Sequence, residues 1–293
     1  MELVVPLSTR VEGSPTTPEI LLLTTTVLDR NNVTISGRQD GPVLLFAHGF
    51  GCDQDMWRKV IPAFTDDYRV VAFDHVGAGQ SDPDAYESGK YSSLEGYAQD
   101  LLEICAELNL REVTLVAHSV SAMMAVVAAV AEPSRFAHLV LVGPSPSYID
   151  DPATGYVGGF SRTDIEDLLE SLDSNYFAWA AAIAPMVMGN PDSPELGEEL
   201  AGSFCRTNPD TAREFARVTF LSDTRHLLSQ VVTPTLVLQC SEDMLASVEV
   251  GQYVHQQIAD STLVQLAATG HCPHVSAPEE TAAAIADYLH PDR

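Results

Sequence analysis

Three residues whose side chains can act together in nucleophilic catalysis are spread along this chain. Ser119, Asp243 and His271 each lie a few residues beyond an apolar run that predicts a β-strand. A serine hydroxyl is a weak nucleophile until a neighbouring imidazole takes its proton. A carboxylate then orients the imidazole and stabilises its protonated form. The order serine, acid, histidine suits three loops at one edge of a parallel sheet, so the sequence predicts a catalytic triad of these residues.

The acid and the base of this triad each have a neighbour that could take the same role. Glu242 directly precedes Asp243, and His274 follows His271 in the same loop. Residue type and position after a strand suit both members of each pair. We predict that Asp243 orients His271, with Glu242 and His274 as the alternatives.

The residues around Ser119 predict the sharp turn that exposes a nucleophile. A buried strand leads into the serine, and an apolar helical segment, 122–130, follows it. The usual form of this turn is G-x-S-x-G, in which small residues let strand and helix approach each other. Here Ala117 and Ser121 replace the two glycines, so small size is kept and the glycines are lost.

A second loop predicts an oxyanion hole. His48-Gly49-Phe50-Gly51 follows the predicted strand 42–47, and this loop is expected to supply one backbone N–H. We assign that donor to Phe50 and the second to Val120, the residue after the nucleophile. Two such donors would stabilise the negative charge that develops on a carbonyl oxygen.

Apolar runs alternate with helical patterns along most of the chain, which predicts a mostly parallel, eight-stranded sheet flanked by helices. Together with the turn at Ser119 and the order serine, acid, histidine, this predicts the α/β-hydrolase fold. A region without convincing strands, 144–232, interrupts the alternation and predicts a four-helix lid, with helices near 162–173, 175–188, 194–205 and 209–221. We therefore divide the chain into a loose leader (1–18), a first core part (19–143), the lid (144–232) and a second core part (233–293). The expected strands are 19–27, 32–37, 42–47, 68–73, 112–116, 139–142, 235–238 and 262–267.

Charge and composition narrow the possible partners. The chain has 293 residues, a formal net charge of −26 and two lysines, Lys59 and Lys90. Such a surface should repel nucleic acid and anionic membranes. The five cysteines form no paired pattern and the first residues have no basic leader, so we expect a cytoplasmic protein. No metal motif such as HExxH occurs, and we expect neither metal nor cofactor.

Several long motifs carry a family resemblance. They are HGFGCDQDMW at 48–57, YRVVAFDHVGAGQSD at 68–82, AHSVSAMM at 117–124, GPSPSYIDD at 143–151, GGF at 158–160, LSD at 221–223 and GHCPH at 270–274. With them the chain resembles the RsbQ-type α/β-hydrolases of bacteria and their plant relatives, the karrikin and strigolactone receptors. The likeness runs from about residue 43 to residue 289, and Ala117 departs from the glycine usual in that family.

The resemblance implies the same triad and a four-helix cap over a hydrophobic pocket. It implies that an apolar ester or lactone of small size is cleaved through an acyl-serine intermediate. The alternative within the family is a slow-turnover ligand receptor or stress-signalling regulator, with a signalling protein contacting the lid. The pocket positions implied for this chain are Phe50, His118, Val120, Tyr148, Phe160, Trp179, Ile183 and Phe220.

Overall fold

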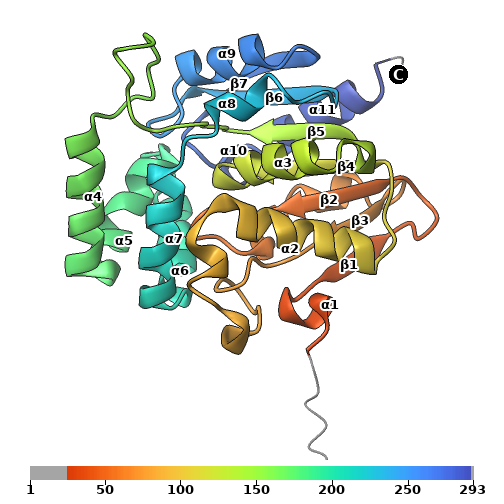
Figure 1. Ribbon diagram of the computed structural model, residues 1–293, viewed down its shortest axis with the longest axis horizontal. Helices are drawn as coiled ribbons and strands as arrows, with labels where there is room; N and C mark the ends of the chain where they lie inside the picture. Colours follow the sequence, from red (N-terminus) through yellow and green to blue (C-terminus); the bar gives the residue numbers. More distant parts are fainter. Residues whose placement is uncertain (1–24, 292–293) are drawn as a thin grey trace, which may run out of the picture.

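The protein forms one seven-stranded sheet, as seen in a computed structural model that describes residues 25–291 (Figure 1). The strand order is β1-β3-β2-β4-β5-β6-β7, and every neighbouring pair is parallel except β1 with β3. The strands are β1 (Thr34–Gly37), β2 (Val43–Ala47), β3 (Arg69–Ala72), β4 (Val113–His118), β5 (Phe136–Val142), β6 (Thr235–Glu242) and β7 (Ser261–Thr269).

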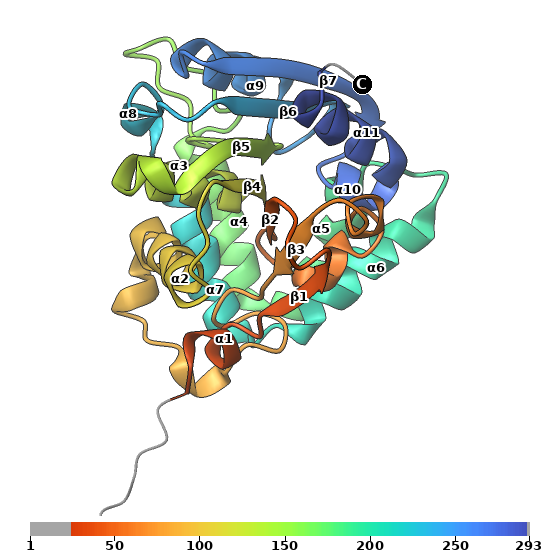
Figure 2. The same ribbon diagram turned by 90° about the vertical axis from the view of Figure 1, so that its right-hand side faces the viewer.

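Helices cover both faces of this sheet (Figure 2). On one face pack α2 (Leu94–Glu107), α3 (Val120–Ala131), α8 (Arg225–Leu228) and α9 (Val248–Gln257), while α11 (Pro278–Leu289) packs on the other. Successive side chains of a strand point to opposite faces. In β4, Leu115 and Ala117 therefore lie in the first core and Val116 in the second. Double coverage explains why the central strands read as continuous apolar runs.

Eight strands were predicted, but the sheet formed by the described residues has seven, and the difference lies near the N-terminus. Most of the expected first strand, 19–27, lies outside the described residues, as does the leader 1–18. Within the described part, Val27 begins a short helix, α1 (Val27–Arg30), instead of ending a strand. Thr26 caps this helix, because its side chain accepts a hydrogen bond from the backbone N–H of Asp29.

Four helices between β5 and β6 occupy the region predicted to interrupt the alternation. They are α4 (Arg162–Ser174), α5 (Tyr176–Met188), α6 (Pro194–Arg206) and α7 (Pro209–Leu221), and Figure 1 shows them gathered beside the sheet. Local signals set their ends: Ser161 and Asp164 form a capping box, and Gly189 ends α5 in the left-handed conformation. We call α4–α7 the lid helices. The exact division of the chain into leader, core and lid stays a prediction.

The lid helices have a core of their own, which they share with loops of the sheet. Leu172, Trp179, Leu200 and Phe220 of the lid pack in one cluster with Tyr148 and other residues from loops that follow strands. Ion pairs add to this attachment at the edge of α6, where Arg206 lies 2.5 Å from Asp53. Among residues 25–291, no helix is long and apolar enough to cross a membrane.

Three histidines are buried as neutral side chains in this fold. Burial is the largest cause that lowers the pKa of His75 and His118 well below the ordinary value, and it lowers the pKa of His274 to about 3. In the unfolded chain each would take up a proton near its ordinary pKa of 6.5, whereas the folded protein leaves it neutral.

We therefore expect stability to fall as the pH drops below about 6.5, because the unfolded state then binds more protons. The free energy of unfolding should decrease by roughly 1 kcal/mol per pH unit for each such histidine. Urea unfolding between about pH 7 and about pH 5 measures the slope. A His274→Phe variant should show a shallower slope, and an unchanged slope would contradict this explanation.

Candidate active site

Ser119 sits on a strained turn between β4 and α3. Its backbone has φ 58° and ψ −125°, an unfavourable region for a residue with a side chain. The strand ends at His118 and the helix begins at Val120, so the reversal takes place at the serine itself. The Ser119 N–H donates to the carbonyl of Val142 on β5 at 2.8 Å, which ties the turn to the next strand.

The residues that replace the two usual glycines are accommodated in different ways. Ala117 is buried in the core beneath the turn. The Ser121 hydroxyl donates to the carbonyl of His48 and lies 2.7 Å from Nε2 of His75. The added hydroxyl therefore has hydrogen-bond partners and is not left unsatisfied in the interior.

The structure brings the three predicted catalytic residues into one hydrogen-bonded row. His271 Nε2 lies 2.7 Å from Ser119 Oγ, and His271 Nδ1 lies 2.7 Å from Asp243 Oδ2. The other Asp243 oxygen accepts the backbone N–H groups of Leu245 and Ala246 at 2.9 and 3.1 Å. An ionised carboxylate only accepts, so Nδ1 of His271 carries the proton and Nε2 faces the serine as a base.

Neither alternative residue is placed in this row. Glu242 is exposed at the end of β6. His274 is buried against Trp57 and His118, with ring centroids 4.4 Å away in both cases. Within residues 25–291, neither ring nitrogen of His274 has a hydrogen-bond partner, so it does not contact Ser119 through a hydrogen bond.

Gly143 makes room for the histidine and was missed by the sequence analysis. The β7 loop must cross the ends of β6 and β5 to bring His271 to β4. Gly143 follows β5 with φ 57°, and a methyl group there would lie 3.3 Å from Cε1 of His271 and 3.6 Å from Oδ2 of Asp243. A glycine directly after a core strand, at the start of the GPSPSY motif, was the signal that could have revealed it.

The predicted oxyanion loop lies directly against the nucleophile. A methyl group on Gly49 would lie 3.1 Å from Cβ of Ser119. Val120 is the first residue of α3, and an N–H in the first turn of a helix has no partner within the helix. The backbone N–H groups of Phe50 and Val120 are therefore the candidate donors beside the serine.

A small apolar cavity lies above Ser119, between the core and the lid helices. The volume of this cavity is about 30 Å³, because aromatic and aliphatic side chains nearly fill the space. Six predicted pocket residues line it: Phe50, His118, Tyr148, Trp179, Ile183 and Phe220. The lining also includes residues that the sequence analysis missed: Cys52, Leu168, Val187, Leu200, Phe204, Thr219, Leu245 and Cys272.

Two predicted pocket residues do not line the cavity. The Val120 side chain is packed in the core beneath α3, because the start of the helix turns it away from the lid. Phe160 is partly buried and packs against the cluster formed by the lid helices, and it is not among the residues that line the cavity. The cavity lining therefore does not include these two predicted side chains, although the backbone of Val120 stays beside Ser119.

Phe50 is the centre of the aromatic packing that fills this cavity. Its ring centroid lies 5.5–6.3 Å from those of Phe215, Phe204, Phe220 and Trp179. Such distances are typical of favourable aromatic pairs. Because the free volume of the cavity is about 30 Å³, entry of a ligand of several non-hydrogen atoms requires that these rings move.

Two thiols in the lining are poor nucleophiles. Burial raises the pKa of Cys52 to about 12, and burial likewise raises that of Cys272 well above the usual value. Because the thiolate is the reactive form, neither thiol competes with Ser119. In the described part of the chain, no group of three or more His, Cys, Asp or Glu side chains is arranged to hold a metal ion.

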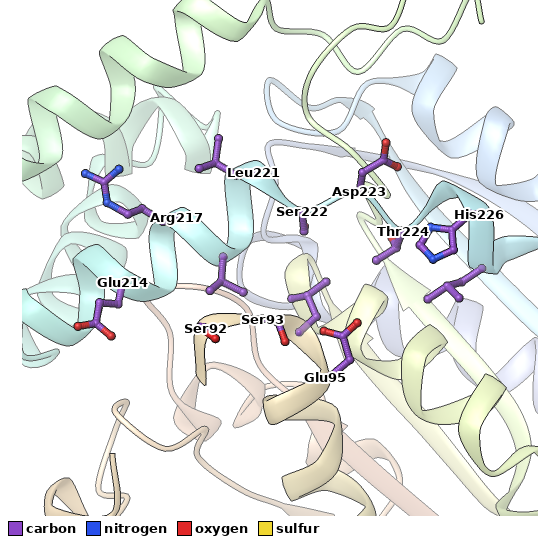
Figure 3. A pocket seen from close by; sticks show the side chains of 13 residues that line it. Ser92, Ser93, Glu95, Glu214, Arg217, Leu221, Ser222, Asp223, Thr224 and His226 are labelled. Carbon is purple, nitrogen blue, oxygen red and sulfur yellow. The ribbon is translucent and has the colours of Figure 1, made fainter. Parts of the chain in front are cut away.

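A surface groove with a larger volume, about 490 Å³, lies between the start of α2 and the end of α7 (Figure 3). Ser92, Ser93 and Glu95 face Glu214 and Arg217 across it. In the part of the chain that the structure describes, no histidine or cysteine is hydrogen-bonded to Ser92, Ser93 or Ser222, so these serines are not activated as nucleophiles. The chemistry is concentrated in the smaller cavity.

Comparison with known proteins gives the class to which this fold and site belong. The family model for the alpha/beta hydrolase fold matches residues 42–278. The chain therefore belongs to the α/β-hydrolase family. This confirms the fold class predicted from the sequence.

Individual relatives show which members of this family the chain is similar to. The chain is 38% identical to "Karrikin insensitive 2 receptor CA" of Petunia hybrida, over 91% of this chain and 98% of the relative. It is 37% identical to "Strigolactone esterase RMS3" of Pisum sativum, over 87% and 94%. A solved hydrolase from Oleispira antarctica has 43% identity and a TM-score of 0.87, with 91% and 97% of the two chains covered. The predicted likeness to the karrikin and strigolactone receptor group is confirmed.

The geometry predicts which acid matters for activity. Asp243→Asn should lower the rate of ester hydrolysis by about 10⁴-fold, because the amide favours the wrong tautomer of His271. Glu242→Gln, one residue away and exposed, should leave the rate within about twofold. Steady-state kinetics on one model ester compare the two. The reverse pattern would assign the role to Glu242.

Proposed function

We propose that the protein is a serine hydrolase that cleaves a small apolar ester or lactone through an acyl-serine intermediate. The observation that carries this proposal is the hydrogen-bonded row Asp243–His271–Ser119, which ends at the floor of an apolar cavity. Buried nucleophile, base and orienting acid together define acyl transfer. Within residues 25–291, the lining of the cavity includes no Asp, Glu, Lys or Arg side chain that would pair with a charged substrate.

The reaction follows from the positions of the atoms. His271 Nε2 takes the proton of Ser119 Oγ as the oxygen attacks the substrate carbonyl, and Asp243 stabilises the imidazolium. The backbone N–H groups of Phe50 and Val120 would receive the carbonyl oxygen as it becomes negative. His271 then gives its proton to the leaving oxygen. Water, activated by the same imidazole, releases the acyl group from the serine.

The enclosure of Ser119 supports a small substrate. The serine is 5% exposed, and lid residues such as Trp179 and Phe220 cover it. Excluding water strengthens the contacts to the developing charge. Relatives named as strigolactone esterase and 3-oxoadipate enol-lactonase support an ester or lactone bond as the target.

A second function has its own support. The cavity is nearly filled, and several relatives are named as receptors, so slow turnover coupled to a protein contact at the lid is the alternative. In that case a signalling partner would contact the lid helices after a ligand has moved them.

Under either function we also propose a cytoplasmic location. The five free cysteines support it, because free thiols persist in a reducing compartment.

Replacing the nucleophile tests the proposal most directly. Ser119→Ala should abolish hydrolysis of p-nitrophenyl acetate and of a simple butenolide, because no other activated nucleophile faces the cavity. Intact-mass measurement of the wild type should show a covalent adduct that the variant lacks. The alternative is favoured if the adduct forms but is released far more slowly than in ordinary esterases. Wild-type-like hydrolysis by Ser119→Ala would contradict both functions.

Enlarging the cavity should change the preference for acyl chain length. Trp179 is 8% exposed and lines the cavity, so Trp179→Ala should raise kcat/KM for longer acyl chains relative to acetate by about tenfold. Phe177→Ala is a matched control, since that ring lies on the same helix but is 52% exposed. Kinetics on p-nitrophenyl esters of increasing length measure the ratio. A wild type that already prefers long chains would contradict the enclosed cavity.

A further inference from the structure

The backbone of His271 is held by two hydrogen bonds, one at its N–H and one at its carbonyl. Its N–H donates to the carbonyl of Val187, in the last turn of the lid helix α5, at 2.8 Å. Its own carbonyl accepts a hydrogen bond from Nε2 of His118, also at 2.8 Å. His118 is the last residue of β4, directly before the nucleophile. The backbone that carries the imidazole is therefore fixed by the lid and by the nucleophile strand together.

The state of the His118 ring follows from its partner. A carbonyl oxygen accepts only, so Nε2 of His118 carries the proton and the neutral ring is a donor. Burial, followed by the neighbouring His274 and His271, lowers the pKa of His118 well below the ordinary value. The donor is thus kept in one protonation state over the ordinary pH range.

Packing fixes the orientation of this ring. His118 is 2% exposed, with ring centroids 4.9 Å from His271 and 4.4 Å from His274. On its other side, a methyl group on Gly49 would lie 2.6 Å from Nδ1. Among the described residues, Nδ1 has no hydrogen-bond partner, so the contact to His271 is the one hydrogen bond of this side chain.

We propose that His118 is a positioning residue, whose Nε2–H holds the His271 carbonyl and keeps the imidazole aligned between Asp243 and Ser119. The inference rests on the proposed role of His271 as base. Both hydrogen bonds of that imidazole are 2.7 Å long. A shift of its backbone would disturb both at once, and a misplacement of about 1 Å can cost about 100-fold in rate.

Because the His118 ring also borders the cavity, a substrate contact is the competing role. The two roles differ in what they change. A lost substrate contact raises KM, whereas a misaligned base lowers the rate of every reaction of the serine, including reactions that need no specific substrate. A reagent that phosphonylates the serine therefore separates them.

The experiment compares His118→Phe, which removes the donor, with His118→Gln, which keeps an N–H donor near the Nε2 position. His118→Asn, whose amide is too short to reach, is a second donor-free variant. His138→Phe is the matched control, since His138 is half-buried on β5 against Tyr288. The rate of Ser119 phosphonylation by a small fluorophosphonate is measured against pH, together with kcat and KM for p-nitrophenyl acetate.

We expect His118→Phe and His118→Asn to lower both the phosphonylation rate and kcat by about 10- to 100-fold, with KM within about twofold. His118→Gln should recover most of the rate, and His138→Phe should match the wild type. The downfield proton signal of the His271–Asp243 hydrogen bond should broaden in the two slow variants. Thermal unfolding confirms that each variant is folded.

An unchanged phosphonylation rate in both donor-free variants would overturn the proposal, as would a rise in KM alone. Equal losses in His118→Gln and His118→Asn would also overturn it, because the donor would then not matter. If the wild type is phosphonylated at Ser119 but cleaves no ester or lactone, the proposed function fails while this test remains valid.

Discussion

The backbone of Ser119, at φ 58° and ψ −125°, ends a buried strand and begins a buried helix within one residue. This conformation is costly for a residue with a side chain, and the surrounding structure has to maintain it. The hydrogen bond to Val142 and the small buried neighbours Ala117 and Ser121 do so. Once the hydroxyl projects from the end of β4, the parallel order β4-β5-β6-β7 brings the loops carrying Asp243 and His271 to the same edge.

The lid helices contribute to the catalytic geometry as well as covering it. The N–H of His271 bonds to Val187 at the end of α5, and Thr269 Oγ1 donates to Gly189 just beyond that helix. At α6, Phe204 packs so closely over Gly51 that a methyl group there would lie 1.8 Å from its ring. Base and oxyanion loop are thus both braced by the lid. A ligand that displaces the lid helices would also act on the residues that process it.

This coupling bears on the choice between enzyme and receptor. The free volume of the cavity beside Ser119 is about 30 Å³, so binding a ligand of several non-hydrogen atoms must move aromatic rings that now contact each other. A ligand therefore spends part of its binding energy on rearranging the lid. In an esterase this cost appears as selectivity for small substrates. In a receptor the same rearrangement would present a changed lid surface to a partner.

The sequence by itself determined most elements and the type of chemistry. Apolar runs marked the central strands β2–β6, and helical patterns placed α4–α7 within about a residue of their ends, whereas Val27, expected in a strand, begins α1. Ser119 and the two loops that carry an acid and a histidine were also local signals. Tertiary structure alone separated Asp243 from Glu242 and His271 from His274, since hydrogen-bond geometry depends on how loops cross the sheet edge. It also removed Phe160 and the Val120 side chain from the cavity and added Phe204 and Gly143 to the site. Side-chain direction within a packed lid depends on contacts between distant segments, which no local pattern encodes.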